Sequence, residues 1–186
     1  MTQLENGALD PATALKCDLA GEVLSSFGNL RFAATGWSML PSVWPGDMLM
    51  VDRAGRDQVR VGDVVLTKRD GRFCAHRVVA ISRDAGDPRW ITQGDGMSAP
   101  DGLVSEKELL GRVRYVIRGG KCVEVPTKLS LGDRVIVAVV RRSIFAARVL
   151  VKLHQMRQGW SEGDAAFDRC PGSAAPPKTS WKTIRA

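Results

Sequence analysis

The fold is decided by Gly62-Asp63-Val64-Val65-Leu66-Thr67, which leads after a short polar interval into Phe73-Cys74-Ala75-His76-Arg77-Val78-Val79-Ala80-Ile81. Both runs are apolar and rich in β-branched residues, and turn-forming residues bound them, which is typical of short β-strands. The pair Gly62-Asp63 indicates a turn that delivers the chain into the first strand, and Gly46-Asp47 has the same place ahead of another apolar run. We therefore predict two strands here.

The same sequence pattern extends from Leu30 to about Val125, where apolar runs alternate with Gly, Asp and Pro turns. The predicted strands cover Met48 to Val51, Val64 to Thr67, Phe73 to Ile81, Trp90 to Thr92, Arg112 to Ile117 and Cys122 to Val125. This pattern predicts a mainly β domain over residues 30–126.

A helix is predicted ahead of this domain. Asp10 is a suitable N-cap and Pro11 suits the first helical position, and apolar residues recur at helical spacing as far as Phe27. The helix should end near Gly28-Asn29. Residues 1–29 are therefore predicted to form an N-terminal helical segment.

A second helix is predicted after the domain, in residues 127–158. From Leu131 to Gln158 apolar residues recur at helical spacing, with a mostly basic set on another face: Arg134, Arg141, Arg148, Lys152 and Gln155. A basic amphipathic helix of this kind lies in a membrane interface or packs on its own β domain, and the pattern leaves both open. The Gly-, Ser-, Ala- and Pro-rich residues 159–186 predict a flexible tail.

Composition limits the function classes. A chain of 186 residues with 44% hydrophobic content can bury one core, which predicts one domain with tails. The formal charge of +7 favours an anionic membrane surface or nucleic acid as a partner, although many basic proteins are merely basic. Nucleic acid is disfavoured, because the single tyrosine and the five scattered tryptophans do not interleave with the lysines and arginines.

The cysteines and the N-terminus suggest a compartment. Cys17, Cys74, Cys122 and Cys170 are scattered without a CxxC pair, which argues against a zinc site and a disulfide framework and favours reduced thiols. The first eleven residues are polar and acidic, and no run of about 18 apolar residues occurs. We expect a cytoplasmic protein without a membrane span, in peripheral contact with the inner face of the membrane.

Serine, histidine and aspartate residues occur in this β region in the order of a catalytic set. Ser38 lies in the turn-like stretch Gly36-Trp37-Ser38-Met39-Leu40-Pro41, His76 lies within a predicted strand, and Asp95 and Asp101 lie in a Gly/Pro loop. Taken singly, a turn serine, a strand histidine and a loop aspartate are more often structural than catalytic. Together they can supply a nucleophile, a base and a group that orients the base.

These residues and their neighbours resemble signal peptidase I, in the archaeal and endoplasmic-reticulum-type branch whose base is histidine. The matching boxes run from about Thr35 to Arg114 in the family's order. They are Ser38-Met39-Leu40-Pro41, Gly46-Asp47, Val61-Gly62-Asp63-Val64-Val65, His76-Arg77-Val78-Val79, Thr92-Gln93-Gly94-Asp95 with Asp101, and Gly111-Arg112-Val113.

The resemblance implies a serine endopeptidase with a coiled β-sheet fold that binds its substrate, a peptide or preprotein with small side chains before the cut, as an added strand. It implies that Ser38 attacks the scissile carbonyl, that His76 takes and returns the proton, and that Asp101 orients the imidazole. Asp95 would structure the loop. Gly36, Met39 and Pro41 would support the nucleophile and the substrate. No metal or organic cofactor is expected.

Related families differ from this branch in the base and in the group that binds the oxyanion. The bacterial branch and the SOS-repressor autoproteases use a lysine base, but Lys68 falls eight positions before His76. Gly36 stands where bacterial-branch relatives offer a serine hydroxyl, so backbone N–H groups are expected to bind the oxyanion. Trp37 stands where the family has a small residue, so the alternative is a catalytically silent peptide-binding or assembly module with Trp37 filling the site.

Overall fold

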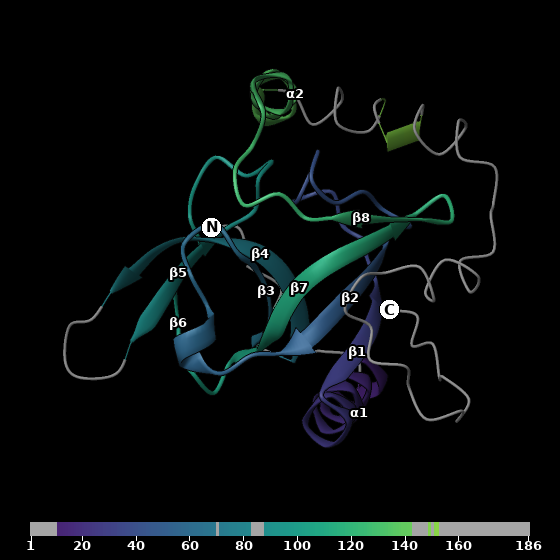
Figure 1. The fold of residues 1–186 in the computed structure, drawn as a ribbon, viewed down its shortest axis with the longest axis vertical. Coiled ribbons are helices and arrows are strands. Elements are labelled where there is room, and N and C mark those ends of the chain that lie inside the picture. The colour runs from purple at the N-terminus through teal and green to yellow at the C-terminus, as the bar shows by residue number, and fades with distance from the viewer. Residues whose placement is uncertain (1–10, 70, 83–87, 143–148, 150, 153–186) are drawn as a thin grey trace, which may run out of the picture.

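A computed structural model describes residues 11–69, 71–82, 88–142, 149, 151 and 152. The predicted tail 159–186 lies outside the described residues, as do residues 1–10 and, within the predicted second helix, residues 143–148, 150 and 153–158. The described part consists of one antiparallel sheet and two α-helices (Figure 1). The prediction of a mainly β protein with flanking helices is therefore confirmed.

The sheet has eight strands in the order β1-β2-β7-β3-β4-β5-β6, and β8 pairs with β7 (Figure 1). The strands are β1 Asn29–Ala33, β2 Met48–Arg53, β3 Val64–Arg69, β4 Arg72–Ser82, β5 Arg89–Gln93, β6 Leu103–Val104, β7 Leu109–Arg118 and β8 Lys121–Glu124, and a short 3₁₀ helix, η1, covers Arg56–Gln58. Each of the six predicted strands is present. No apolar run in the sequence predicted β1 or β6.

Strand β3 explains why its sequence is a continuous apolar run. Side chains alternate between the two faces of a strand. Val64 and Leu66 enter one buried cluster, whereas Val65 enters a second cluster with Val78 and Trp90 on the opposite face. Because both faces of β3 are covered, its first three residues are all apolar and do not alternate with polar residues.

The predicted turns ahead of β2 and β3 are present and require glycine. Gly46 and Gly62 have φ values of +96° and +99°, which L side chains rarely adopt. A Cβ at Gly62 would also lie 2.8 Å from the carbonyl oxygen of Thr127. These two turns fix the points at which β2 and β3 begin.

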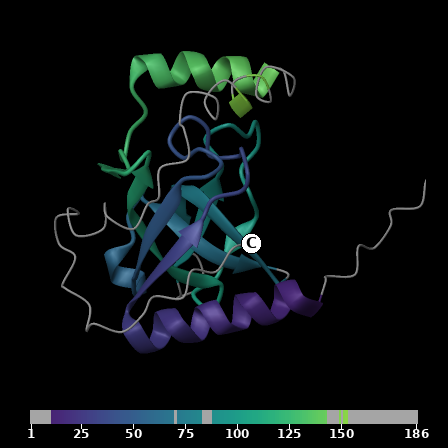
Figure 2. The ribbon, with the colours of Figure 1, turned by 90° about the vertical axis from the view of Figure 1, so that its right-hand side faces the viewer.

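The two helices lie at opposite ends of the molecule (Figure 2). Helix α1, Pro11–Phe27, buries Ala20 and Leu24 against the sheet and ends at Gly28, whose N–H donates to the Leu24 carbonyl oxygen. Helix α2, Leu131–Arg142, begins after Ser130, whose hydroxyl exchanges hydrogen bonds with Asp133. Its buried side packs on the turn between β1 and β2, so the packing alternative predicted for this helix holds for one of its faces.

Candidate active site

Ser38 lies in the turn that joins β1 to β2, and the residues after it anchor that turn in the protein. Met39 and Leu40 are buried, and the Val43 N–H donates to the Met39 carbonyl oxygen. From β7, Arg118 donates to the Ser42 carbonyl oxygen at 2.9 Å. Ser38 itself is half-buried, so a fixed turn holds its hydroxyl near the surface.

His76 lies on β4 opposite Val65 of β3, and its side chain is almost fully buried. Its Nε2 lies 3.0 Å from the Ser38 Oγ, and its Nδ1 lies 2.5 Å from an Asp101 carboxylate oxygen. The same oxygen accepts a 2.8 Å hydrogen bond from the Thr92 hydroxyl on β5. The structure therefore brings the serine, histidine and aspartate of the predicted set together, in that order.

This arrangement indicates the protonation pattern of the imidazole. An ionised carboxylate only accepts hydrogen bonds, so Asp101 pairs with a protonated Nδ1. In neutral imidazole the other nitrogen then has a free lone pair. Nε2 is thus the atom that can accept the proton of the Ser38 hydroxyl.

The loop after β5 lies directly against the nucleophile turn. The Gly96 N–H donates to the Ser38 carbonyl oxygen at 2.8 Å. A Cβ at Gly94 would lie 2.7 Å from the same oxygen and 3.1 Å from the His76 Nε2. The sequence indicated only that these glycines belong to an irregular loop, whereas the close approach of two backbones explains why position 94 has no side chain.

Asp95 belongs to a buried ion pair beneath the site. Arg77, next to His76 on β4, donates to both Asp95 carboxylate oxygens at 2.8 Å, and the Ser42 hydroxyl donates to one of them at 2.5 Å. Arg77 also donates to the carbonyl oxygens of Gly62 at 2.7 Å and Pro126 at 2.6 Å. One arginine therefore joins the aspartate loop, the nucleophile turn, the turn before β3 and the segment that leads to α2.

Sequence reasoning assigned no role to Arg77. The available signal was its place beside His76 on a strand, where alternation puts its side chain on the opposite face. Its partners lie between 15 and 49 residues away in the sequence. No local pattern shows such contacts.

Cys74 lies beside the imidazole, with its Sγ 3.3 Å from both ring nitrogens. Burial, with a smaller contribution from the Asp101 charge, raises the pKa of the Cys74 thiol to about 11. The thiol is therefore neutral at physiological pH, and it packs against the ring as a small apolar group. Cys74 is thus poorly suited to act as the nucleophile.

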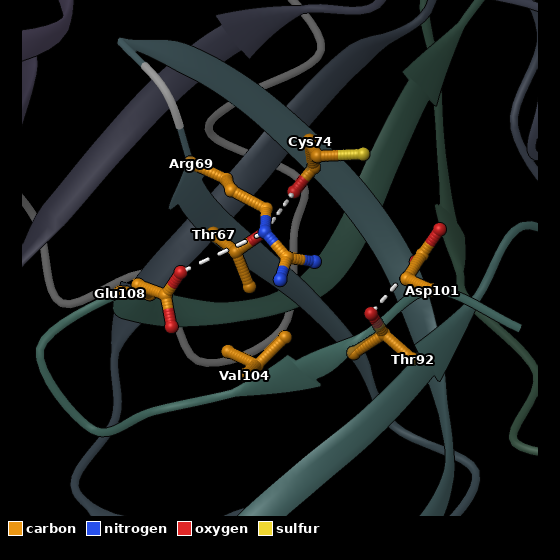
Figure 3. A pocket seen from close by; sticks show the side chains of 7 residues that line it. All are labelled: Thr67, Arg69, Cys74, Thr92, Asp101, Val104 and Glu108. Atoms are coloured by element: carbon orange, nitrogen blue, oxygen red, sulfur yellow. Dashed lines mark hydrogen bonds and ion pairs between the residues drawn. The ribbon is translucent and has the colours of Figure 1, made fainter.

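A cavity of about 70 Å³ lies behind the carboxylate of Asp101 (Figure 3). Figure 3 shows the Arg69 side chain reaching into it from β3. Its lining consists of Thr67, Arg69, Cys74, Thr92, Asp101, Val104 and Glu108. Neither Ser38 nor His76 lines it, so this cavity is distinct from the place where a scissile bond would meet the serine.

The other predicted site residues take different places. Gly36 is exposed, with open space at its Cβ position, whereas Met39 and Pro41 are buried below the turn. Trp37 is 37% exposed. Among the residues that the structure describes, the backbone N–H groups of Ser38 and Met39 donate no hydrogen bond.

Lys68 forms an ion pair with Asp18 of α1. It is thus engaged on the side of the first helix, and it makes no contact with Ser38 within the described ranges. This placement agrees with histidine, and not lysine, as the candidate base.

Two further observations concern metals and membranes. Within the described ranges no group of three or more His, Cys, Asp and Glu residues could hold a metal ion, and no helix is long and apolar enough to cross a membrane.

Cys122 is disulfide-bonded, so the prediction of four reduced thiols is wrong for this residue. Spacing along the chain does not show which cysteines meet in space. Because disulfides persist mainly in oxidising compartments, the cysteines no longer support a cytosolic location.

No family model matches the chain. Among curated proteins, the chain is similar to the signal peptidase complex catalytic subunit SEC11C of human, mouse and dog. In each comparison the identity is 34% over 88 residues, and the match covers 41% of this chain and 46% of the relative. The chain thus spans about half the length of the curated relatives it matches. This similarity and the β-rich fold support a relationship of the chain to the signal peptidase I superfamily, in the branch of the endoplasmic-reticulum and archaeal type.

Proposed function

We propose that this protein is a serine endopeptidase in which Ser38 is the nucleophile, His76 the general base and Asp101 the residue that orients the base. The observation that carries the proposal is the pair of distances, 3.0 Å from the Ser38 Oγ to the His76 Nε2 and 2.5 Å from the His76 Nδ1 to Asp101. The first distance lies within the range of about 2.6–3.2 Å expected of hydrogen-bonded catalytic partners, and the second is slightly shorter.

The proposed reaction proceeds in two steps. In the first, the Ser38 Oγ bonds to the scissile carbonyl carbon while the His76 Nε2 takes the hydroxyl proton. The same nitrogen then gives that proton to the leaving amine as the peptide C–N bond breaks. In the second step, water attacks the acyl-enzyme with His76 again as the base, which releases the new carboxyl end and restores Ser38.

Two groups would stabilise charge during these steps. Asp101 would hold the imidazolium that forms on His76, because its carboxylate is already paired with Nδ1. The N–H groups of Ser38 and Met39 would donate to the oxyanion, an interaction whose loss costs about 10²–10³ in rate in serine proteases. No serine hydroxyl is needed at position 36 for this function.

The substrate class that we propose is an extended peptide or a preprotein. It is supported by the similarity to a signal peptidase complex catalytic subunit and by the β-rich fold beside Ser38. We also propose that the protein works in peripheral contact with an anionic membrane.

A comparison of peptide termini in cells that carry the wild-type protein or Ser38→Ala would identify cleaved substrates. On a substrate found in this way, Ser38→Ala, His76→Ala and the double variant should be similarly inactive, because nucleophile and base act as one unit. If His76→Ala keeps most of the cleavage activity, the assignment of the base is wrong. If no peptide differs between the two cell lines and purified Ser38→Ala binds peptides as the wild type does, the silent peptide-binding module replaces this proposal.

A further inference from the structure

Helix α2 has one buried face and one exposed apolar face. Val137 and Val140 are buried. Leu131, Val135 and Val139 are 79%, 65% and 51% exposed, and they stand four residues apart. Side chains at this spacing form one stripe along a helix. The described protein leaves this stripe uncovered.

Basic residues lie along one side of the stripe and at its C-terminal end. At about 100° per residue, Arg134 lies to one side of it and Arg142 continues it toward the C-terminus of the helix. Both are exposed, as is Lys152 further along the chain, and none of the three forms an ion pair within the described ranges. The acidic residue of the helix, Asp133, caps its N-terminus by accepting from Ser130.

We propose that α2 is a docking helix for an anionic lipid surface, with Leu131, Val135 and Val139 entering the headgroup boundary. An apolar stripe bordered by arginines and lysines is the pattern of helices that lie in a membrane interface. The net charge of +7 adds attraction to anionic lipid.

A second copy of the chain fits this face less well than a bilayer does. Specific protein interfaces bury about 800 Å² on each partner, far more than three aliphatic side chains supply. A parallel pairing of the stripe would also place the Arg142 side chains of both copies next to each other, where like charges repel. Anionic headgroups instead complement both the apolar and the basic parts of the face.

The position of α2 gives the docking a consequence for the site. Its buried face packs against Leu40 and Trp44 of the turn that carries Ser38. Val140 lies over Gly96, where an added Cβ would be 3.2 Å from its Cγ1, and Arg141 donates to the Asp95 carbonyl oxygen at 3.2 Å. A helix docked on lipid would therefore hold the Ser38 turn and the aspartate loop beside the bilayer. This consequence rests on the proposed peptidase function, whereas the docking does not.

Co-sedimentation with vesicles tests the proposal. The full chain is mixed with vesicles of phosphatidylglycerol and phosphatidylcholine, or of phosphatidylcholine alone, at low and high salt. We expect binding to the anionic vesicles that salt weakens. Arg134→Gln/Arg142→Gln/Lys152→Gln should lower the partition coefficient about 100-fold, at about fivefold for each charge. Val135→Gln/Val139→Gln keeps the charge and should lower it at least about tenfold through lost apolar burial.

A matched control comes from the other end of the molecule. Leu15 and Leu19 of α1 are also exposed apolar residues four apart, at 69% and 50%, so Leu15→Gln/Leu19→Gln makes the same chemical change away from α2. This variant should bind anionic vesicles as the wild type does, and circular dichroism should show that every variant is folded.

Several results would overturn the proposal. They are the absence of wild-type binding to anionic vesicles, equal partitioning of the wild type and both α2 variants, and an equal loss in the α1 control. A wild-type dimer in sedimentation equilibrium that Val135→Gln/Val139→Gln converts to a monomer would assign the face to a second copy instead. Because binding is measured without a substrate, a failure here leaves the peptidase proposal standing, and inactivity of the enzyme leaves the docking standing.

Discussion

Gly94→Ala should separate the aspartate loop from the nucleophile turn. The added Cβ would lie 2.7 Å from the Ser38 carbonyl oxygen, 2.8 Å from the Met97 Cγ and 3.1 Å from the His76 Nε2. The Met97 side chain can turn away, but the Ser38 oxygen is backbone and accepts from the Gly96 N–H. Since close C–H···O contacts have C···O distances of about 3.3 Å or more, the loop and the turn must move apart by roughly 0.6 Å.

A displacement of this size acts on reactivity more than on stability. A misplacement of about 1 Å can cost about 10²-fold in rate, so Ser38 reactivity should fall roughly 10- to 100-fold. Overpacking of this kind costs about 1–3 kcal/mol of stability, which leaves a folded protein at moderate temperature. The readout is the second-order rate at which a fluorophosphonate probe labels Ser38, because this rate needs no knowledge of the substrate.

Gly36→Ala provides the control for Gly94→Ala. It adds the same methyl group two residues before Ser38, where a Cβ meets no heavy atom within 4 Å, and it should label at the wild-type rate. The reasoning is refuted if folded Gly94→Ala labels as fast as the wild type. It is also refuted if Gly36→Ala loses as much reactivity as Gly94→Ala.

Three further predictions follow from the surroundings of the imidazole. Asp95→Asn should lower the free energy of unfolding by about 3 kcal/mol in urea titrations, because it leaves the buried Arg77 guanidinium without its anionic partner; an unchanged midpoint would contradict this. Native Cys74 should resist iodoacetamide near pH 8 and react once unfolded. Burial raises the pKa of the folded Cys74 thiol from 9.0 to about 11. The contribution of this thiol to the free energy of unfolding should therefore be present below pH 9 and lost toward pH 11, and Cys74→Ala should show no such loss of stability. Cleavage should be lost in acid, because a protonated imidazole cannot serve as the base; cleavage that persists in acid would contradict His76 as the base.

The strands were predictable where their signal is local. Apolar, β-branched runs bounded by glycine turns marked β2, β3, β4, β5, β7 and β8, and capping residues with helical spacing marked α1. Strand β1 was missed because Asn29 and Arg31 interrupt a five-residue run directly after a helix. Strand β6 has only two residues, which is too short for any period to appear.

The candidate site was predictable from residue types in the family's order, which named Ser38, His76 and Asp101. Its supporting contacts were not, because they depend on how distant backbones meet. The close approach at Gly94 and the hydrogen bonds of Arg77 to Gly62 and Pro126 join segments that local sequence does not relate.

The contacts of the second helix were likewise not predictable from its sequence. Its amphipathic pattern was visible, but the pattern could not show that Arg141 donates a hydrogen bond to the Asp95 carbonyl oxygen. The structure thereby reduces the charges available for lipid contact and places the helix beside the nucleophile turn.

The most direct test of the central claim is to map the covalent adduct after the protein reacts with a fluorophosphonate. The account predicts one adduct per chain, on Ser38. It predicts no adduct in Ser38→Ala. It also predicts that His76→Ala is labelled at least about 100-fold more slowly than the wild type, which is the smallest rate contribution expected of a general base. An adduct on another residue such as Ser42, no adduct on the folded wild type, or labelling of His76→Ala at the wild-type rate would contradict it.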